Sequence, residues 1–234
     1  MTEALSYWAV VPAAGVGKRM LADIPKQYLR VNDETILDIT LSRLLSHEKI
    51  DGVVLAVSPG DEYWPESKYY NHANVITVEG GKERSDSVFN ALNKLADLQS
   101  AETRVLVHDA ARPCIESTDI SRLINEVGES PDGGLLGVPV KDTMKQTQSD
   151  NRVSSTLDRE NLWHAYTPQM FPLQSVLTAL NHVRDKRLAV TDDASAMEIL
   201  GYKPLMVEGS SKNIKITQPD DLALANIYLQ NQNL

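Results

Sequence analysis

The stretch Ala9–Met20, AVVPAAGVGKRM, indicates both the fold of the chain and the place of its site. An apolar run ends there at a proline, and two alanines, two glycines and two basic residues follow within one loop. A continuous apolar run is typical of a strand that is buried on both faces. Glycines directly after such a strand let backbone N–H groups approach a bound anion closely. The stretch therefore predicts a buried first strand that ends at a candidate phosphate-binding loop.

The chain repeats this pattern of buried strands and adds helices between them. Apolar runs occur at Trp8–Val11, Val53–Val57, Val75–Val78, Val105–Val107 and Leu135–Val140. Apolar residues at helical spacing lie between the runs: Leu37, Leu41, Leu44 and Leu45; Val88, Ala91, Leu92 and Leu95; Ile120, Leu123, Ile124 and Val127. Strands that alternate with helices predict an α/β fold with a mostly parallel, twisted, helix-covered sheet. A chain of 234 residues is typical of one such domain, so we expect a single domain over residues 1–234.

The alternation resumes in the last third of the chain. We expect, in order, a strand at Trp163–Phe171, a helix with Leu173, Val176, Leu177 and Leu180, a short helix, strands at Pro204–Val207 and Asn213–Ile216, and a last helix from Thr217 through Leu229. Asp192 and Asp193 are suited to cap the short helix, which should end before Gly201.

One long polar segment interrupts the alternation, at Lys141–Arg159 (KDTMKQTQSDNRVSSTLDR). It is either a disordered loop or a β-hairpin arm that turns around Ser149–Asn151. An unstructured insert of this length is uncommon inside a compact domain, so we favour the arm. Because the segment is too polar to bury itself, we expect a partner subunit to stabilise it.

Composition excludes several classes of function. The 23 basic and 32 acidic residues give a net charge of −9, which argues against binding to nucleic acid or to an anionic membrane. No segment approaches the roughly 20 apolar residues of a membrane span, and the N-terminus does not resemble a signal peptide. Cys114 is the only cysteine, so neither an internal disulfide nor a cysteine metal cluster can form. We expect a cytoplasmic protein.

The first glycine loop does not match the two best-known phosphate-binding motifs. Gly15 and Gly17 begin a dinucleotide fingerprint, but Met20 stands where the third glycine belongs. Arg19 follows Gly17 and Lys18 where a P-loop requires Ser or Thr. The glycines alone leave open an ordinary turn between a strand and a helix.

Positive charge near this loop favours a nucleotide. Lys18, Arg19 and Lys26 concentrate cations beside the loop in a chain that is acidic as a whole. Pro25 restrains the backbone just before Lys26, which lowers the cost of ordering that lysine. A triphosphate matches this arrangement of charge.

A second glycine turn lies in VEGGKERSDSV, Val78–Val88. Gly80 and Gly81 permit close approach of a base or ribose, and Arg84, Ser85 and Ser87 offer hydrogen-bond donors. The alternative is a helix entry that a serine caps.

Two further places offer charged groups. In VLVHDAARP, Asp109 follows a buried strand at the edge where α/β sheets bind ligands, and it is suited to hold Mg²⁺; the alternative is an aspartate that caps a loop. Arg112 is expected to pair with Asp109 or to reach a phosphate, and His108 to pack at the strand end. Lys215 alternates with apolar residues in NIKIT and should point into the site, unless it is an ordinary surface cation.

Taken together and in order, these motifs resemble one family. They are PAAGxGxRM, PKQYL, GGxERxxSV, VHDAARP, PVKDTMK, DRxxLWxAxTPQ, TDDASAxE and VEGxxxNIKIT, from about Ala9 to Leu229. Their order is similar to that in the 2-C-methyl-D-erythritol 4-phosphate cytidylyltransferases of the non-mevalonate isoprenoid pathway.

The resemblance implies a nucleotidyltransferase of the glycosyltransferase-A-like α/β type, usually a homodimer, that uses CTP, 2-C-methyl-D-erythritol 4-phosphate and Mg²⁺. It assigns CTP binding to Ala13, Ala14, Gly15, Gly17, Lys18, Gly80, Gly81, Arg84 and Ser87. It assigns the metal to Asp109 and the contacts with the acceptor phosphate to Thr143, Arg159 and Lys215. We expect Arg19, Lys26 and Lys215 to act in catalysis and Arg112 to contact the acceptor as well. Thr143 and Arg159 lie on the arm 141–159, which the resemblance implies is used in dimerisation and presents both residues to the neighbouring subunit.

Three competing functions differ in what they require. Cytidylyl transfer to ribitol 5-phosphate would use the same CTP motifs, and Thr143 and Arg159 favour methylerythritol phosphate instead. A protein that only senses CTP has little need for Asp109, Lys26 and Arg19 together. The broken fingerprint disfavours a dinucleotide-dependent dehydrogenase.

Overall fold

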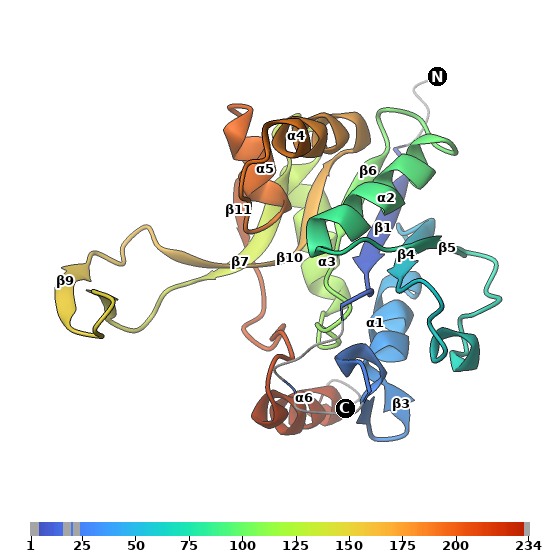
Figure 1. The fold of residues 1–234 in the computed structure, drawn as a ribbon, viewed down its shortest axis with the longest axis horizontal. Coiled ribbons are helices and arrows are strands. Elements are labelled where there is room, and N and C mark those ends of the chain that lie inside the picture. Colours follow the sequence, from blue (N-terminus) through green and yellow to red (C-terminus); the bar gives the residue numbers. More distant parts are fainter. Residues whose placement is uncertain (1–4, 16–19, 21–23, 232–234) are drawn as a thin grey trace.

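The structure, a computed structural model, describes residues 5–15, 20 and 24–231. These residues form one α/β body from which a thin hairpin projects (Figure 1). In the described part, the body contains a seven-stranded sheet with the strand order β11-β7-β10-β6-β1-β4-β5. Its strands are β1 (Tyr7–Pro12), β4 (Gly52–Val57), β5 (Val75–Glu79), β6 (Arg104–Val107), β7 (Gly134–Pro139), β10 (Trp163–Pro172) and β11 (Leu205–Glu208).

The sheet is mostly parallel, as predicted. The pairs β1–β4, β1–β6, β4–β5 and β7–β11 are parallel, and β10 runs antiparallel to both of its neighbours, β6 and β7. Because β1, β4 and β6 share one direction, the loops that follow them meet at one edge of the sheet. This edge carries the first glycine loop and the VHDAARP motif.

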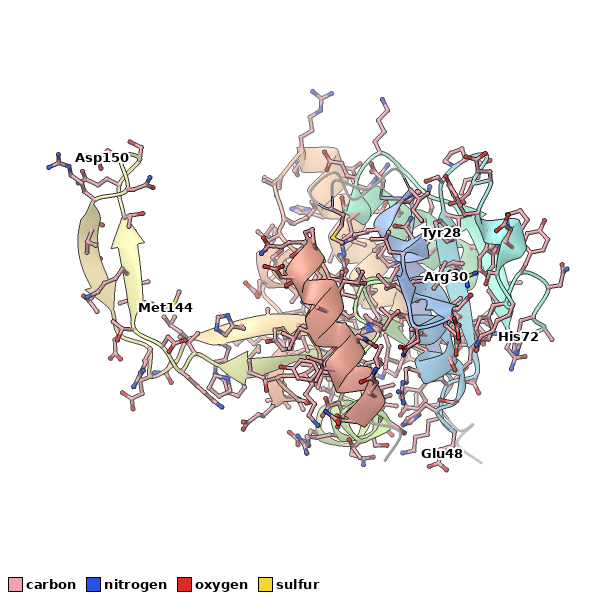
Figure 2. All side chains as sticks on the ribbon, turned by 90° about the horizontal axis from the view of Figure 1, so that it is seen from below. Tyr28, Arg30, Glu48, His72, Met144 and Asp150 are labelled. Atoms are coloured by element: carbon pink, nitrogen blue, oxygen red, sulfur yellow. The ribbon has the colours of Figure 1, made fainter. Side chains whose placement is uncertain are left out.

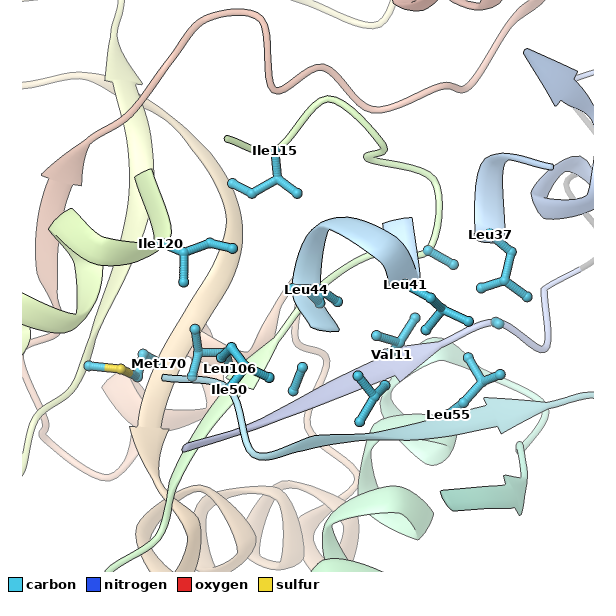
Figure 3. Packing of buried hydrophobic residues seen from close by; sticks show 14 of the residues in the cluster. Val11, Leu37, Leu41, Leu44, Ile50, Leu55, Leu106, Ile115, Ile120 and Met170 are labelled. Carbon is cyan, nitrogen blue, oxygen red and sulfur yellow. The ribbon is translucent and has the colours of Figure 1, made fainter. Parts of the chain in front are cut away.

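Helices cover both faces of the sheet and bury alternate strand residues. On one face, α1 (Ile36–Leu45) and α3 (Ser117–Val127) pack on Val11, Leu55 and Leu106 (Figure 3). On the other face, α2 (Arg84–Ala96), α4 (Leu173–Lys186) and α5 (Asp193–Ile199) pack on Val10 and Val54. Consecutive strand residues point to opposite faces, so continuous apolar runs such as that in β1 serve both layers. Burying each large aliphatic side chain contributes about 1.5–3 kcal/mol.

The polar insert forms the hairpin that projects from the body (Figures 1 and 2). Strands β8 (Met144–Thr147) and β9 (Val153–Leu157) pair antiparallel, and Asn151 takes a left-handed φ of 63° in the turn between them. Val153 and Leu157 are 60% and 41% exposed. The expected β-arm is therefore confirmed.

The predicted strand at Asn213–Ile216 is wrong. The Asn213 carboxamide donates to Thr167 O, Arg112 donates to Asn213 O, and Ile216 N–H donates to Ala111 O. These partners lie on separate segments, so within the described part of the chain no ladder with a neighbouring strand forms. Ile216 is still fully buried, which explains why the apolar alternation was misleading.

The last helix, α6 (Pro219–Asn231), lies below the sheet in the view of Figure 1 and shares an apolar cluster with Ile36 of α1. The sequence predicted that this helix starts at Thr217, and in the structure it starts two residues later, at Pro219. Ala225 and Leu229 of α6 pack with Ile216 and Cys114 in a separate apolar cluster. The connecting elements η2 (Lys26–Tyr28), β2 (Arg30–Val31), β3 (Glu34–Thr35) and η3 (Trp64–Glu66) are short. Among the helices described, none combines the length and the apolar character needed to cross a bilayer.

Candidate active site

A cavity of about 260 Å³, which we call the central cavity, opens where β1 and β6 end and α2 begins. It gathers predicted site residues from five separate sequence motifs. These residues are Ala13, Ala14, Gly15, Lys26, Gly81, Arg84, Ser87, Asp109 and Lys215. The parallel strands of the sheet thus bring the separate sequence motifs to one place.

A second cavity, also of about 260 Å³, adjoins the central one. Its lining residues are Arg84, Asp109, Arg112, Ala165, Tyr166, Thr167, Gln169, Thr191, Asp192 and Lys215. Arg84, Asp109 and Lys215 line both cavities. The same three charged side chains are therefore accessible to two ligands bound side by side.

The first glycine loop is held to the protein through its carbonyl groups. The Gln27 carboxamide donates to Ala13 O at 2.5 Å, and the Ser58 hydroxyl donates to Ala14 O at 3.0 Å. Ala13 N–H donates to Ala56 O of β4 at 2.7 Å. The bonds from Gln27 and Ser58 engage two carbonyl acceptors of the loop within the protein, which favours the approach of an anionic ligand.

The second glycine turn needs glycine because it packs against the first loop. A Cβ atom on Gly80 would lie 2.4 Å from Ala14 Cβ, and one on Gly81 would lie 2.1 Å from Asp86 Cβ. Ser87 Oγ accepts from Gly81 N–H at 3.0 Å, so this buried serine shapes the turn from within the protein. The two loops therefore form one continuous wall of the central cavity.

Asp109 is the centre of a cluster of three cations. Its Oδ1 lies 2.8 Å from Arg84 Nε, and its Oδ2 lies 2.8 Å from Lys215 Nζ and 3.5 Å from Arg112 Nε. Burial raises the pKa of the Asp109 carboxyl, but the charges of Arg84, Lys215 and Arg112 outweigh burial and hold that pKa well below its ordinary value. Asp109 is therefore ionised at neutral pH and holds these cations at the boundary of the two cavities.

A second buried carboxylate extends the cluster to α5. Arg84 Nη1 donates to Asp193 Oδ2 at 2.9 Å, and Asp193 is 1% exposed. Burial raises the pKa of Asp193, although the charge of Arg84 opposes this shift. Gln169 of β10 secures the start of α5, because it donates to Asp192 Oδ2 and accepts from Ala194 N–H, both at 2.8 Å.

His108 is a packed residue, as expected, and cannot serve as a base from its position. Its Nε2 lies 3.1 Å from Arg112 O and its Nδ1 lies 3.0 Å from Thr167 Oγ1. Complete burial lowers the pKa of His108 to about 4, so the ring is neutral at physiological pH. Its hydrogen bonds instead tie the end of β6 to β10.

The family model for 2-C-methyl-D-erythritol 4-phosphate cytidylyltransferase (IspD) matches residues 7–231. The chain belongs to this family. A Vibrio parahaemolyticus protein named 2-C-methyl-D-erythritol 4-phosphate cytidylyltransferase is 52% identical over 227 residues, which are 97% of each chain. A Hahella chejuensis protein of the same name is 51% identical over 95% of this chain and 92% of its own.

Solved structures of cytidylyltransferases have the same fold. The crystal structure of the Francisella tularensis enzyme has a TM-score of 0.83 and 40% identity, and it covers 95% of this chain and 99% of that one. A crystal structure of 4-diphosphocytidyl-2C-methyl-D-erythritol synthase has a TM-score of 0.84 and 36% identity, with coverage of 97% and 100%. The resemblance in the sequence motifs is thus confirmed, together with the α/β fold and the cytidylyltransferase activity.

Some predicted residues of the cytidylyltransferase lie away from the cavities. Thr143 precedes β8 and Arg159 follows β9, and both are exposed and line neither cavity of their own chain. The Arg159 guanidinium donates to Lys141 O instead. Gly17, Lys18 and Arg19 lie outside the described residues.

Arg112 pairs with Asp109, which is one of the two alternatives that the sequence left open. Its guanidinium also lies 4.6 Å from the centre of the Tyr166 ring and donates to Asn213 O at 2.7 Å. The sequence predicted no role in the site for Asn213, Gln169 or Asp193, and it placed Asp193 only as a cap of the short helix. Each of the three lies in a sequence motif of the family but acts through partners far away along the chain.

The carboxylate of Asp109 fits a metal site in which the protein supplies only one ligand. Within residues 5–15, 20 and 24–231, no group of three or more His, Cys, Asp or Glu side chains could hold a metal ion together. A lone ionised carboxylate suits Mg²⁺ that takes its remaining ligands from phosphate and water. The residues therefore fit a metal that binds together with a phosphate ligand.

Proposed function

We propose that the central cavity binds CTP, that the second cavity binds the phosphate of 2-C-methyl-D-erythritol 4-phosphate, and that transfer occurs at their boundary. The products are 4-diphosphocytidyl-2-C-methyl-D-erythritol and pyrophosphate. One observation carries this assignment: Arg84, Asp109 and Lys215 line both cavities. Two anionic groups can approach each other only where cations offset their repulsion, and Arg84 and Lys215 supply cations at that place.

In the proposed reaction an oxygen of the acceptor phosphate attacks the α-phosphorus of CTP in line. A bond from that oxygen to the α-phosphorus forms, and the bond from the α-phosphorus to the oxygen that bridges to the β-phosphate breaks. A phosphate monoester is already ionised at neutral pH, so no general base is required, which agrees with a buried and neutral His108. Positioning and charge neutralisation then supply the catalysis.

Lys26, together with Arg19, is proposed to stabilise charge on the α-phosphate and on the leaving pyrophosphate. Lys26 lines the central cavity, and its Nζ donates to Ile216 O at 3.1 Å. Asp109 would hold Mg²⁺ beside the triphosphate, where the ion supplies further positive charge to the phosphate oxygens. Gly80, Gly81 and Ser87 shape the wall against which the cytidine would lie.

Lys215 and Arg112 are proposed to bind the acceptor phosphate in the second cavity. Thr143 and Arg159 would complete that cavity from the arm of a second copy of the chain, in a homodimer. The projection of the arm and the exposure of Val153 and Leu157 support this assignment, because a single chain leaves both apolar side chains in water. The single cysteine supports a cytoplasmic location, and the net charge of −9 supports small-molecule partners over nucleic acid or membranes.

Pyrophosphate release tests the proposed substrates. The enzyme is supplied with CTP and Mg²⁺ and, separately, with 2-C-methyl-D-erythritol 4-phosphate or ribitol 5-phosphate. Release with the first acceptor alone is expected. Release with ribitol 5-phosphate alone would move the assignment to that acceptor, and release with neither would contradict the proposed reaction.

A further inference from the structure

The segment from Ile214 to Gln218 has no regular secondary structure, yet it contacts both lysines of the proposed mechanism. Lys215 lies on it and reaches Asp109, with Nζ and Oδ2 2.8 Å apart. The next residue, Ile216, accepts a hydrogen bond from Lys26 Nζ at 3.1 Å. Because no ladder holds this segment, other contacts must fix its backbone.

Asp221, in the first turn of α6, supplies those contacts. Its Oδ2 accepts from Thr217 N–H at 2.8 Å, from Thr217 Oγ1 at 2.8 Å and from Gln218 N–H at 3.0 Å. The helix that carries Asp221 is itself anchored, since Ala225 and Leu229 pack in the cluster that contains Ile216. One carboxylate oxygen thus ties the end of the segment to a packed helix.

The geometry of one peptide group connects Asp221 to Lys26. The peptide between Ile216 and Thr217 is trans, so its C=O and N–H project from opposite edges of one rigid plane. Asp221 holds the N–H edge, and Lys26 Nζ binds the C=O edge. A rotation of this plane would move the acceptor of Lys26, and Asp221 opposes that rotation.

Charge strengthens this connection. Desolvation raises the pKa of Asp221, but the hydrogen bonds from Thr217 and Gln218 and the positive charge of Lys26 outweigh it, so the pKa lies below its ordinary value. The carboxylate is therefore ionised at neutral pH, and hydrogen bonds to an ionised acceptor are stronger than those to a neutral one.

We propose that Asp221 is a positioning residue that aims Lys26 into the central cavity through the Ile216–Thr217 peptide. The inference rests on the proposed role of Lys26 in stabilising charge during transfer. It gives α6, which lines neither cavity, a specific function in the reaction.

A simple alternative is that Asp221 only stabilises the start of α6 as an acidic residue in the first turn. Asp220 provides the matched control, because it lies in the same turn and carries the same charge. It is exposed, and its side chain makes no hydrogen bond within the described part of the chain. Asp220→Asn therefore removes a negative charge from the first turn of α6 and leaves the hydrogen bonds of the Ile216–Thr217 peptide unchanged.

The test compares Asp221→Asn with Asp220→Asn by kcat, by KM for each substrate and by thermal melting. Asp221→Asn should lower kcat about tenfold and leave the KM for the acceptor within about twofold. Asp220→Asn should leave kcat within about twofold and lower the melting temperature less than Asp221→Asn does, because only Asp221 accepts hydrogen bonds from Thr217 and Gln218. Equal kcat values for the two variants would overturn the proposal.

A double-mutant cycle separates positioning from general damage. Lys26→Ala should lower kcat, and adding Asp221→Asn to Lys26→Ala should cause no further loss beyond about twofold. If the fold-losses in kcat of the two single variants multiply in the double variant, the inference would be overturned. Should Asp221→Asn fail to fold, Asp221→Glu takes its place, because it keeps the charge but shifts the carboxylate; a wild-type kcat for that variant would also overturn the inference. Should Lys26→Ala keep a normal kcat, the proposed role of Lys26 itself fails, which is a distinct outcome.

Discussion

Arg84 and the buried Asp193 form an ion pair between the first turn of α2 and the first residue of α5, with Nη1 and Oδ2 2.9 Å apart. The pair spans 109 positions of sequence and joins two helices on the same face of the sheet. Arg84 also contacts Asp109, so the position of this guanidinium in both cavities depends on two carboxylates.

Asp193→Asn should lower kcat/KM for CTP about tenfold and the free energy of unfolding by about 2 kcal/mol, because a neutral partner holds Arg84 less firmly. Steady-state kinetics and urea unfolding measure the two effects. Asp38→Asn is the control, since Asp38 is another buried carboxylate, bonded to Ser67 and outside both cavities. Equal kcat/KM values for the two variants would contradict the prediction.

His108 should make stability depend on pH. The folded protein binds a proton on this ring only near a pKa of about 4, whereas the unfolded chain binds one near 6.5. The stabilisation from a neutral His108 is therefore fully present above pH 6.5 and is lost as the pH falls from 6.5 towards 4, by roughly 3 kcal/mol in total.

Urea unfolding at a series of pH values checks this dependence. His108→Gln should remove most of the slope between pH 6.5 and 4.5, and His47, whose pKa burial also lowers, should account for the remainder. The pKa of Asp109 is held below its ordinary value of 3.8, so its contribution is lost only at still lower pH. An unchanged slope in His108→Gln would show that other groups cause it.

Gly80→Ala should damage the enzyme far more than Gly15→Ala. The new methyl group would lie 2.4 Å from Ala14 Cβ, whereas a Cβ on Gly15 meets no described atom within 4 Å. We expect Gly80→Ala to lower the free energy of unfolding by about 1–3 kcal/mol and to raise the KM for CTP, because the two loops must separate. Thermal melting of both variants tests this, and similar melting temperatures would argue against the close approach of the loops.

A mixed dimer tests whether the arm completes a neighbouring site. One chain carries Arg159→Ala and the other carries Lys26→Ala, and each variant alone should be nearly inactive as a homodimer. In the mixed dimer, one site keeps both residues and the other loses both, so about half of the wild-type kcat per dimer should return. A mixed dimer without activity would contradict a site shared between chains.

The sequence predicted the body of the fold well, because the signals for it are local. The continuous apolar run of β1 and the helical stripe of α1 each indicate an element from a few adjacent residues. The position of Asp109 was predicted in the same way, since a carboxylate that directly follows a buried strand lies at the ligand-binding edge of the sheet.

The wrong strand and the residues that the sequence did not reveal have a different physical origin. Ile214 and Ile216 alternate with Lys215 as in a strand, but a strand also needs a partner, and the partners of this segment are scattered over the chain. The roles of Gln169 and Asp193 depend on contacts between segments that only the folded sheet brings together. No local pattern of residue types carries that information.

The proposed sharing of the projecting hairpin between two chains has a consequence for how the enzyme would respond to its own abundance. An active site that needs residues from two chains exists only after the chains have met, so its amount follows mass action. Below the dissociation constant of the dimer, halving the number of chains would reduce the number of complete sites about fourfold. A cell that makes such an enzyme would gain catalytic capacity more steeply than it gains protein until most chains are paired.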